Sequence, residues 1–85
     1  MKRISPKFIF ASYVITRSYS GVVIKDIYTT PRRYSWALED RLIGSLLEVS
    51  SHSYTTPGQA RRRLYQVAQR LQDRRDTKRA LGGEE

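Results

Sequence analysis

Two segments in the first third of the chain concentrate β-branched and aromatic residues. They span residues 7–17 and 22–28, and the residues between them are mostly polar and end in Gly21. Segments of this kind are typical of strands, and a short polar connection that ends in glycine is typical of a turn. The pattern predicts a two-stranded antiparallel β-hairpin over residues 7–28.

The first of these segments is apolar on both of its faces, because alternate residues of a strand point to opposite sides. The two faces hold, respectively, Phe8, Phe10 and Val14, and Ile9, Ala11, Tyr13 and Ile15. A lone hairpin is marginal in water, and its edges can pair with another copy. One face is expected to pack inside the domain, and the other predicts a homodimer formed through the hairpin.

Two Thr-Pro pairs, Thr30-Pro31 and Thr56-Pro57, have the chemistry of helix starts. Threonine is a good N-cap, and proline is favoured at the first helical position. Gln59 stands three residues after Thr56, which completes a capping box at the second start. These signals predict helices over residues 31–50 and 57–81.

The first predicted helix has an apolar surface that covers about half of its circumference at about 100° per residue. The residues on this surface are Trp36, Leu38, Leu42, Ile43, Leu46, Leu47 and Val49. A surface this broad predicts the core helix of the domain.

The second predicted helix has a narrower apolar stripe, made of Ala60, Leu64, Val67, Ala68 and Leu71. Beyond Leu71 the same positions hold Arg75 and Lys78, so packing is expected to end near Leu71. The remaining turns are expected to project or fray, supported only by local ion pairs. Those pairs are Asp76 with Arg79 and Arg70 with Asp73.

The length of 85 residues allows a single domain over residues 1–85. The predicted fold class is α+β, in which the hairpin of residues 7–28 packs on two antiparallel helices and a flexible acidic tail occupies residues 82–85. A ribbon-helix-helix fold shares only the order strand, helix, helix and gives no role to the first strand. A helix-turn-helix would need a short glycine-centred turn, which is missing between the predicted helices.

Charge indicates the class of partner. The chain has 16 lysines and arginines against 8 acidic residues, a formal net charge of +8 and a pI near 10.3, and arginine outnumbers lysine by 12 to 4. This balance favours nucleic acid, an anionic membrane or an acidic protein surface. Guanidinium groups are also suited to bidentate pairing with phosphate or carboxylate. We therefore expect the partner to be a nucleic acid or an acidic protein surface.

Composition also bears on the compartment. The chain has no cysteine, which excludes disulfides and thiolate metal sites and fits a reducing compartment. No stretch approaches the roughly 20 apolar residues of a membrane span. The basic start and the apolar residues after it are not followed by the cleavage site of a signal peptide. The sequence predicts a soluble protein of the cytoplasm.

Catalytic chemistry has little support. His52 is the one histidine and lies in an expected loop, and without a thiol no Ser-His-acid or Cys-His set can be assembled. The glycines match no phosphate-binding loop. Asp73 and Asp76 are interleaved with arginines that would repel a metal cation. We expect no enzymatic activity, no cofactor, no metal site and no small-molecule substrate.

The second predicted helix is strongly basic. Helical geometry places Arg63, Arg70 and Arg74 along one flank of the apolar stripe and Arg61 with Arg79 along the other. Such a ridge can follow phosphates and gain affinity from counterion release. The predicted anion-binding residues are Arg61, Arg62, Arg63, Arg70, Arg74, Arg75, Lys78 and Arg79, with Arg32 and Arg33 at the start of the first predicted helix and a smaller basic cluster at Lys2, Arg3 and Lys7. These residues predict a small, non-catalytic nucleic-acid-binding or regulatory protein.

Charge alone leaves an alternative of another class. A small adaptor or inhibitor, of the kind that phages and other mobile elements encode, could dock on an acidic surface of a larger host protein or enzyme. Such docking depends on a few central anchors, among which tyrosine is favoured, and Tyr19, Tyr54 and Tyr65 are the candidates. Binding of the basic helix to an anionic membrane is a third alternative, although its stripe lacks the bulky Trp or Phe common in such helices.

Overall fold

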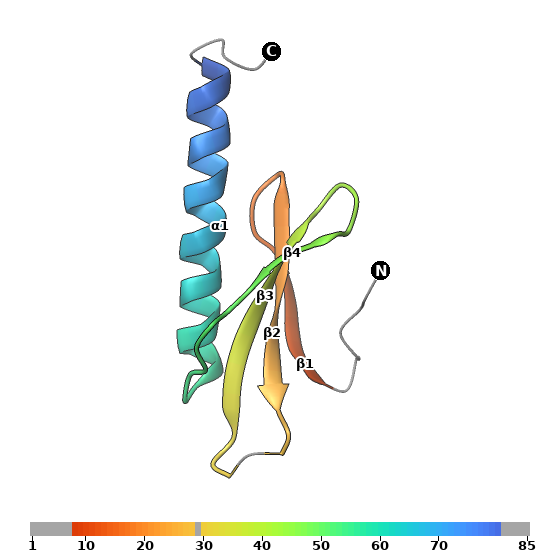
Figure 1. The fold of residues 1–85 in the computed structure, drawn as a ribbon, viewed down its shortest axis with the longest axis vertical. Helices are drawn as coiled ribbons and strands as arrows, with labels where there is room; N and C mark the ends of the chain where they lie inside the picture. The colour runs from red at the N-terminus through yellow and green to blue at the C-terminus, as the bar shows by residue number, and fades with distance from the viewer. Residues whose placement is uncertain (1–7, 29, 81–85) are drawn as a thin grey trace.

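The computed structural model describes residues 8–28 and 30–80. Within these ranges the elements are β1 (Ile9–Val14), β2 (Tyr19–Asp26), β3 (Arg33–Asp40), β4 (Leu46–Val49) and α1 (Pro57–Ala80). The strands form one antiparallel sheet in the order β1-β2-β3-β4, and α1 lies along one side of it (Figure 1). The fold therefore differs from the expected hairpin with two helices.

The helix predicted over residues 31–50 is wrong, because this segment forms β3, a turn and β4. In β3, Trp36 and Leu38 belong to the core beneath α1, whereas Ala37 between them lies on the other side of the sheet. This alternation is the period of a strand. When the sequence of two such strands and their turn is plotted on a helical wheel, the apolar residues spread over much of its circumference. This explains the broad apolar surface of the predicted helix.

The turn between β3 and β4 is stabilised by Asp40 and Gly44. The Oδ1 atom of Asp40 accepts hydrogen bonds from the backbone N of Leu42 at 2.9 Å and of Ile43 at 3.3 Å. Gly44 has a φ of 75°, in the left-handed region that glycine adopts without steric cost. The Thr30-Pro31 pair does not start a helix but lies between β2 and β3, with a cis peptide bond.

The first two strands pair as the sequence predicts. Tyr13 lies opposite Gly21 and Ser12 opposite Val22, with a register shift between Ile9 and Ala11. Such a bulge lets two residues of one strand oppose a single residue of its neighbour. The hairpin is therefore irregular at the start of β1 and regular toward its turn.

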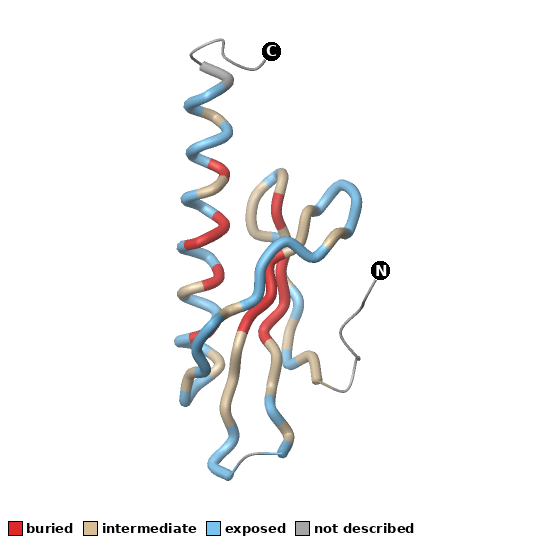
Figure 2. The backbone as a smooth tube through the Cα atoms, in the orientation of Figure 1, coloured by how far each residue is buried: buried red, intermediate tan, exposed pale blue. Residues whose placement is uncertain are grey.

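The core lies between α1 and one face of the sheet. Ala60, Leu64 and Ala68 of the helix form one buried cluster with Val23 of β2 and Trp36 of β3. Figure 2 shows buried turns of α1 along the side that faces buried segments of the central strands. The buried Nε1 atom of Trp36 has no hydrogen-bond partner in the described part of the chain, a cost that the packing of the large indole ring offsets.

Gly21 sets the distance between helix and sheet. A Cβ atom at this position would lie 2.7 Å from the carbonyl oxygen of Ala37 and 2.8 Å from a methyl carbon of Leu64. Both separations are shorter than van der Waals contact between such atoms allows. Glycine in β2 therefore permits Leu64 to sit directly on the backbone of the sheet.

The other face of the sheet is not covered by a helix of the described residues (Figure 1). The strand register places Val14, Val22, Ala37 and Val49 on this face. Val22 and Ala37 are buried, but Val14 is 66% and Val49 is 53% exposed. We call this surface the open face.

The β3–β4 hairpin also exposes large apolar side chains. Leu42 is 78% and Ile43 is 70% exposed in the turn, and Leu46 and Leu47 are exposed in β4. Clusters of exposed apolar residues of this kind mark interaction surfaces in many proteins.

Several sequence-based expectations concern residues outside the described ranges: the acidic tail 82–85, the basic cluster of Lys2, Arg3 and Lys7, and the helix end at Leu81. Over the described ranges, no helix has the length and apolar character needed to cross a membrane.

Candidate nucleic-acid interface

α1 begins at Pro57 with Thr56 as its N-cap. The backbone N of Gln59 donates to Oγ1 of Thr56 at 3.2 Å, as the capping motif predicts. The side chain of Gln59 returns to Thr55, whose backbone N lies 3.3 Å and whose hydroxyl lies 3.0 Å from Oε1. The cap therefore fixes where the helix starts, and the buried Ala60, Leu64 and Ala68 set which side of it faces the sheet.

One flank of α1 lies toward β1. Tyr65 makes an edge-to-face contact with Tyr13 of β1, with ring centroids 5.8 Å apart. The guanidinium carbon of Arg61, one turn earlier, lies 6.0 Å from the centroid of the Tyr13 ring. This arrangement is a cation–π contact at an exposed site, and it leaves the Arg61 guanidinium at the surface.

The opposite flank faces the β3 and β4 side of the sheet, as helical geometry then requires. It carries Arg63, Arg70 and Arg74. Arg63 is half-buried and donates from Nη1 to Oε1 of Gln66 at 3.3 Å. Arg70 and Arg74 are exposed. We call these three residues the cationic flank.

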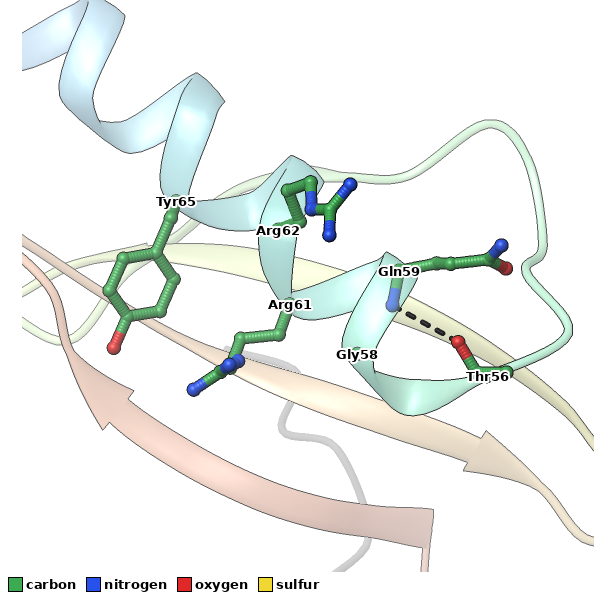
Figure 3. A pocket seen from close by; sticks show the side chains of 6 residues that line it. All are labelled: Thr56, Gly58, Gln59, Arg61, Arg62 and Tyr65. Carbon is green, nitrogen blue, oxygen red and sulfur yellow. Dashed lines mark hydrogen bonds between the residues drawn. The ribbon is translucent and has the colours of Figure 1, made fainter.

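The first two turns of α1 border an open pocket of about 480 Å³. In Figure 3, Arg61 and Tyr65 extend to one side of the helix, while Arg62 points away from the sheet. Thr56, Gly58 and Gln59 complete the lining. The exposed guanidinium groups of Arg61 and Arg62 therefore border the pocket and form part of the positive surface of the helix.

The contact of α1 with the sheet extends beyond Leu71, where it was predicted to end. Gln72 is 5% exposed, and its Oε1 accepts a hydrogen bond from the backbone N of Ser18 at 3.2 Å. Asp76, which lies one helical turn after Gln72, forms an ion pair with Arg17. The partner of Asp76 is thus in the β1–β2 turn, a contact that local pairing rules do not predict.

Arg75 is engaged by the sheet as well. Its Nη1 lies 3.4 Å from the hydroxyl of Tyr19, and its guanidinium carbon lies 5.7 Å from the centroid of the same ring. The hydrogen bond to Tyr19 raises the pKa of Arg75 above its usual value. Arg75 is therefore held by a partner on the sheet, as Arg61 is by Tyr13.

The two acids of α1 are also occupied. Asp73 accepts from Nε2 of Gln69 at 3.2 Å, and Asp76 accepts from Gln72 at 3.2 Å as well as from Arg17. Over the ranges that the structure describes, Arg62, Arg70, Arg74 and Lys78 have no carboxylate partner. Arg79 lies in α1, but its side chain is not among those described. The positive charge on the outer surface of the helix is therefore not neutralised by its own acids.

Arg32 and Arg33 lie apart from this surface, at the start of β3. Arg32 is exposed. Arg33 donates from Nε to Oγ of Ser53 at 2.8 Å and from Nη2 to the carbonyl oxygen of Ser53 at 3.1 Å. Arg33 thereby ties β3 to the loop that leads into α1, and the expectation that both residues start a helix is wrong.

The three tyrosines predicted as protein-docking anchors occupy different environments. Tyr19 is 6% exposed and belongs to the core. Tyr54 is half-buried, and its backbone pairs with that of Tyr34 in an isolated bridge. Tyr65 is 38% exposed beside the pocket. Of the three, Tyr65 offers the largest part of its ring to a partner.

No cluster of three or more histidines or acids that could hold a metal occurs among the described residues. His52 is exposed in the loop between β4 and α1. Its backbone carbonyl accepts a hydrogen bond from the Ser50 hydroxyl at 2.9 Å. The sequence places His52 in a loop between two helices, whereas in the structure this loop connects β4 to α1.

Arg17 and Gln72 hold the C-terminal half of α1 against the β1–β2 turn. The sequence assigns Arg17 no role, and it predicts Gln72 as a glutamine able to reach base edges or sugars, whereas the structure buries its side chain. Gln72 follows directly after the last apolar residue of the stripe, and a glutamine there could have been recognised as a buried polar contact. No local signal identifies Arg17, because its partner lies on the last element of the chain.

No family model, curated protein or solved structure matches this chain.

Proposed function

We propose that this protein is a non-catalytic nucleic-acid-binding protein that contacts the phosphate backbone through the outer surface of α1. The observation that carries the proposal is that several cations of this helix are exposed and have no carboxylate partner. Arg62, Arg70 and Arg74 are exposed without a carboxylate partner among the described residues, while Asp73 accepts from Gln69 of the same helix and Asp76 pairs with Arg17. Cations in this state can release counterions from a nucleic acid.

The dimensions of the cationic flank fit a nucleic-acid backbone. Arg63 and Arg74 are separated by about 16 Å along the helix axis at a rise of about 1.5 Å per residue. This length corresponds to about five base pairs of duplex. Gln66 and Gln69 are exposed on the outer side of the helix and can donate to phosphates or sugars.

The proposal is tested by the salt dependence of binding. A fluorescently labelled duplex is titrated with the protein at several salt concentrations, and anisotropy gives the binding constant. Neutralising about five phosphates predicts a slope of about −4 to −5 for log K against log salt. A flat response between low and moderate salt would refute the proposal.

A pair of charge-matched variants locates the binding surface. Replacing Arg70 and Arg74 together by Gln is expected to reduce the magnitude of the slope by about 2, because each phosphate contact contributes about 0.9. The control replaces Lys25 of β2 and Arg41 of the β3–β4 turn by Gln, which removes the same charge outside α1. Equal losses in the two variants would show that binding follows net charge and not the surface of α1.

A second candidate function is docking on an acidic surface of a larger host protein, as an adaptor or inhibitor. The exposed apolar side chains of Leu42 and Ile43 and the partly exposed ring of Tyr65 favour it. In a pull-down, loss of every partner after nuclease treatment supports nucleic-acid binding. A partner that survives nuclease, and is lost when Tyr65 or Leu42 is replaced by Ser, supports docking.

A further inference from the structure

The pocket beside the first two turns of α1 combines cationic, aromatic and polar side chains. It is lined by Thr56, Gly58, Gln59, Arg61, Arg62 and Tyr65. Its volume of about 480 Å³ lies in the range of about 300–1,000 Å³ that is typical of small-molecule sites. None of the lining residues is acidic, and α1 has no acidic residue before Asp73. The pocket therefore suits an anionic ligand that also has an apolar part.

Tyr65 provides the aromatic surface of this pocket. Its ring makes an edge-to-face contact with Tyr13 of β1, with centroids 5.8 Å apart and an interplanar angle of 72°. Tyr13 is half-buried and packs against the core cluster, so the contact holds the Tyr65 ring in one orientation. Tyr65 itself is 38% exposed. A ring that is already held in place can stack with a flat ligand at a low cost in conformational entropy.

Arg61 places a guanidinium group beside this ring. Arg61 and Tyr65 are one turn apart on α1, and Figure 3 shows both side chains extending to the same side of the helix. The guanidinium carbon of Arg61 lies 6.0 Å from the centroid of the Tyr13 ring. This attraction to a ring uses no hydrogen-bond acceptor, so the guanidinium can still donate to a phosphate. Over residues 8–28 and 30–80, Arg61 and Arg62 have no carboxylate partner.

An unpaired nucleotide has both of the groups that these side chains recognise. Its phosphate pairs with guanidinium groups, and the flat face of its base stacks on an aromatic ring. In a duplex the bases are stacked on one another, so their faces are not accessible to Tyr65. An acidic peptide offers carboxylates to the arginines, but its acidic side chains have no flat ring for Tyr65. The combination of two cations with an exposed ring therefore favours a nucleotide.

We propose that this pocket binds one unpaired nucleotide, with its base against Tyr65 and its phosphate at Arg61 and Arg62. The inference rests on the nucleic-acid binding proposed above and names the class of nucleic acid as one with an unpaired segment. Arg62 points away from the sheet (Figure 3) and joins the pocket to the outer surface of α1. Thr56 and Gln59 are already bonded to each other in the helix cap. Binding is therefore expected to tolerate any base.

The experiment compares a labelled single strand of about 12 nucleotides with a blunt duplex of the same sequence, and fluorescence anisotropy gives both binding constants. Tyr65→Ala is expected to weaken binding of the single strand by about 5- to 100-fold, the loss of one stacked base. Binding of the duplex is expected to stay within about twofold, because no base of the duplex reaches the ring. Tyr65→Phe keeps the ring and is expected to restore single-strand binding.

The matched control is Tyr28→Ala, which removes a tyrosine that is 77% exposed after the end of β2. It is expected to leave both binding constants unchanged. Circular dichroism establishes that each variant is folded.

A measurement on the unmodified protein tests the same contact without a substitution. A single strand that carries 2-aminopurine is expected to lose fluorescence on binding, because this base is quenched when it stacks. Unchanged fluorescence, or equal losses of single-strand and duplex binding in the Tyr65→Ala variant, overturns the inference and leaves the proposed function standing. Absence of binding to both nucleic acids overturns the two together.

Discussion

The two faces of the sheet carry apolar residues of the same types but differ in what covers them. On the face beneath α1, Val23 and Leu38 are fully buried within the core cluster. On the open face, Val14 and Val49 remain more than half exposed. Substitution of fully buried residues of the face beneath α1 is therefore expected to cost more stability than substitution of the exposed residues Val14 and Val49 of the open face.

The largest effect on stability is expected when a buried side chain is removed between α1 and the face of the sheet beneath it, which we call the covered face. Leu64→Ala removes a fully buried side chain and is expected to lower the free energy of unfolding by about 2–5 kcal/mol. The comparison is Val14→Ala on the open face, expected to cost less than about 1 kcal/mol. Urea unfolding followed by circular dichroism at equal protein concentration measures both. Similar costs would contradict the difference between the faces.

The next effect concerns the approach of α1 to the sheet. Gly21→Ala places a Cβ against the Ala37 carbonyl and Leu64 and is expected to destabilise by about 1–3 kcal/mol. Gly58→Ala makes the same change at a helical position with nothing within 4 Å, and is expected to stabilise by about 0.5–1 kcal/mol. Thermal unfolding of the two variants should shift in opposite directions. Shifts of the same sign would show that the close packing at Gly21 is not required.

The smallest of the three effects concerns the contact between the C-terminal half of α1 and the β1–β2 turn. Gln72→Ala removes the hydrogen bond that the backbone N of Ser18 donates to Gln72. The same backbone N also donates to Oγ1 of Thr16 at 3.3 Å, and that bond remains. The expected cost is about 1 kcal/mol, with faster hydrogen exchange at the Ser18 amide. Gln69→Ala on the exposed side of α1 is expected to stay within about 0.5 kcal/mol. Unchanged exchange at Ser18 in the Gln72 variant would place the anchor of the helix elsewhere.

The elements that local chemistry specifies could be predicted from the sequence. The pairing of β1 with β2, the cap at Thr56 and the apolar stripe of α1 depend on residues close together in the chain. The Thr30-Pro31 pair and the spread of apolar residues around a helical wheel predict a helix over residues 31–50, which the structure contradicts. The alternation of Trp36, Ala37 and Leu38 and the turn chemistry of Asp40 and Gly44 were the competing signals.

The candidate site was predictable in part. The exposure of Arg62, Arg70 and Arg74 follows from the position of the apolar stripe. The engagement of Arg75 by Tyr19 and of Asp76 by Arg17 does not, because these contacts join α1 to a turn near the other end of the sequence. Long-range contacts of this kind have no local signal. They also decide which cations remain free for a partner.

The position of α1 after all four strands affects how the chain can reach its fold during synthesis. Leu64 and Ala68 supply one wall of the core, and both are translated after the whole sheet. Strands that emerge first have no apolar layer to pack against until α1 has left the ribosome, and synthesis proceeds at about 5–20 residues per second. The covered face of the sheet therefore stays in contact with water until α1 has emerged, and formation of the core is expected to begin only with the synthesis of the helix.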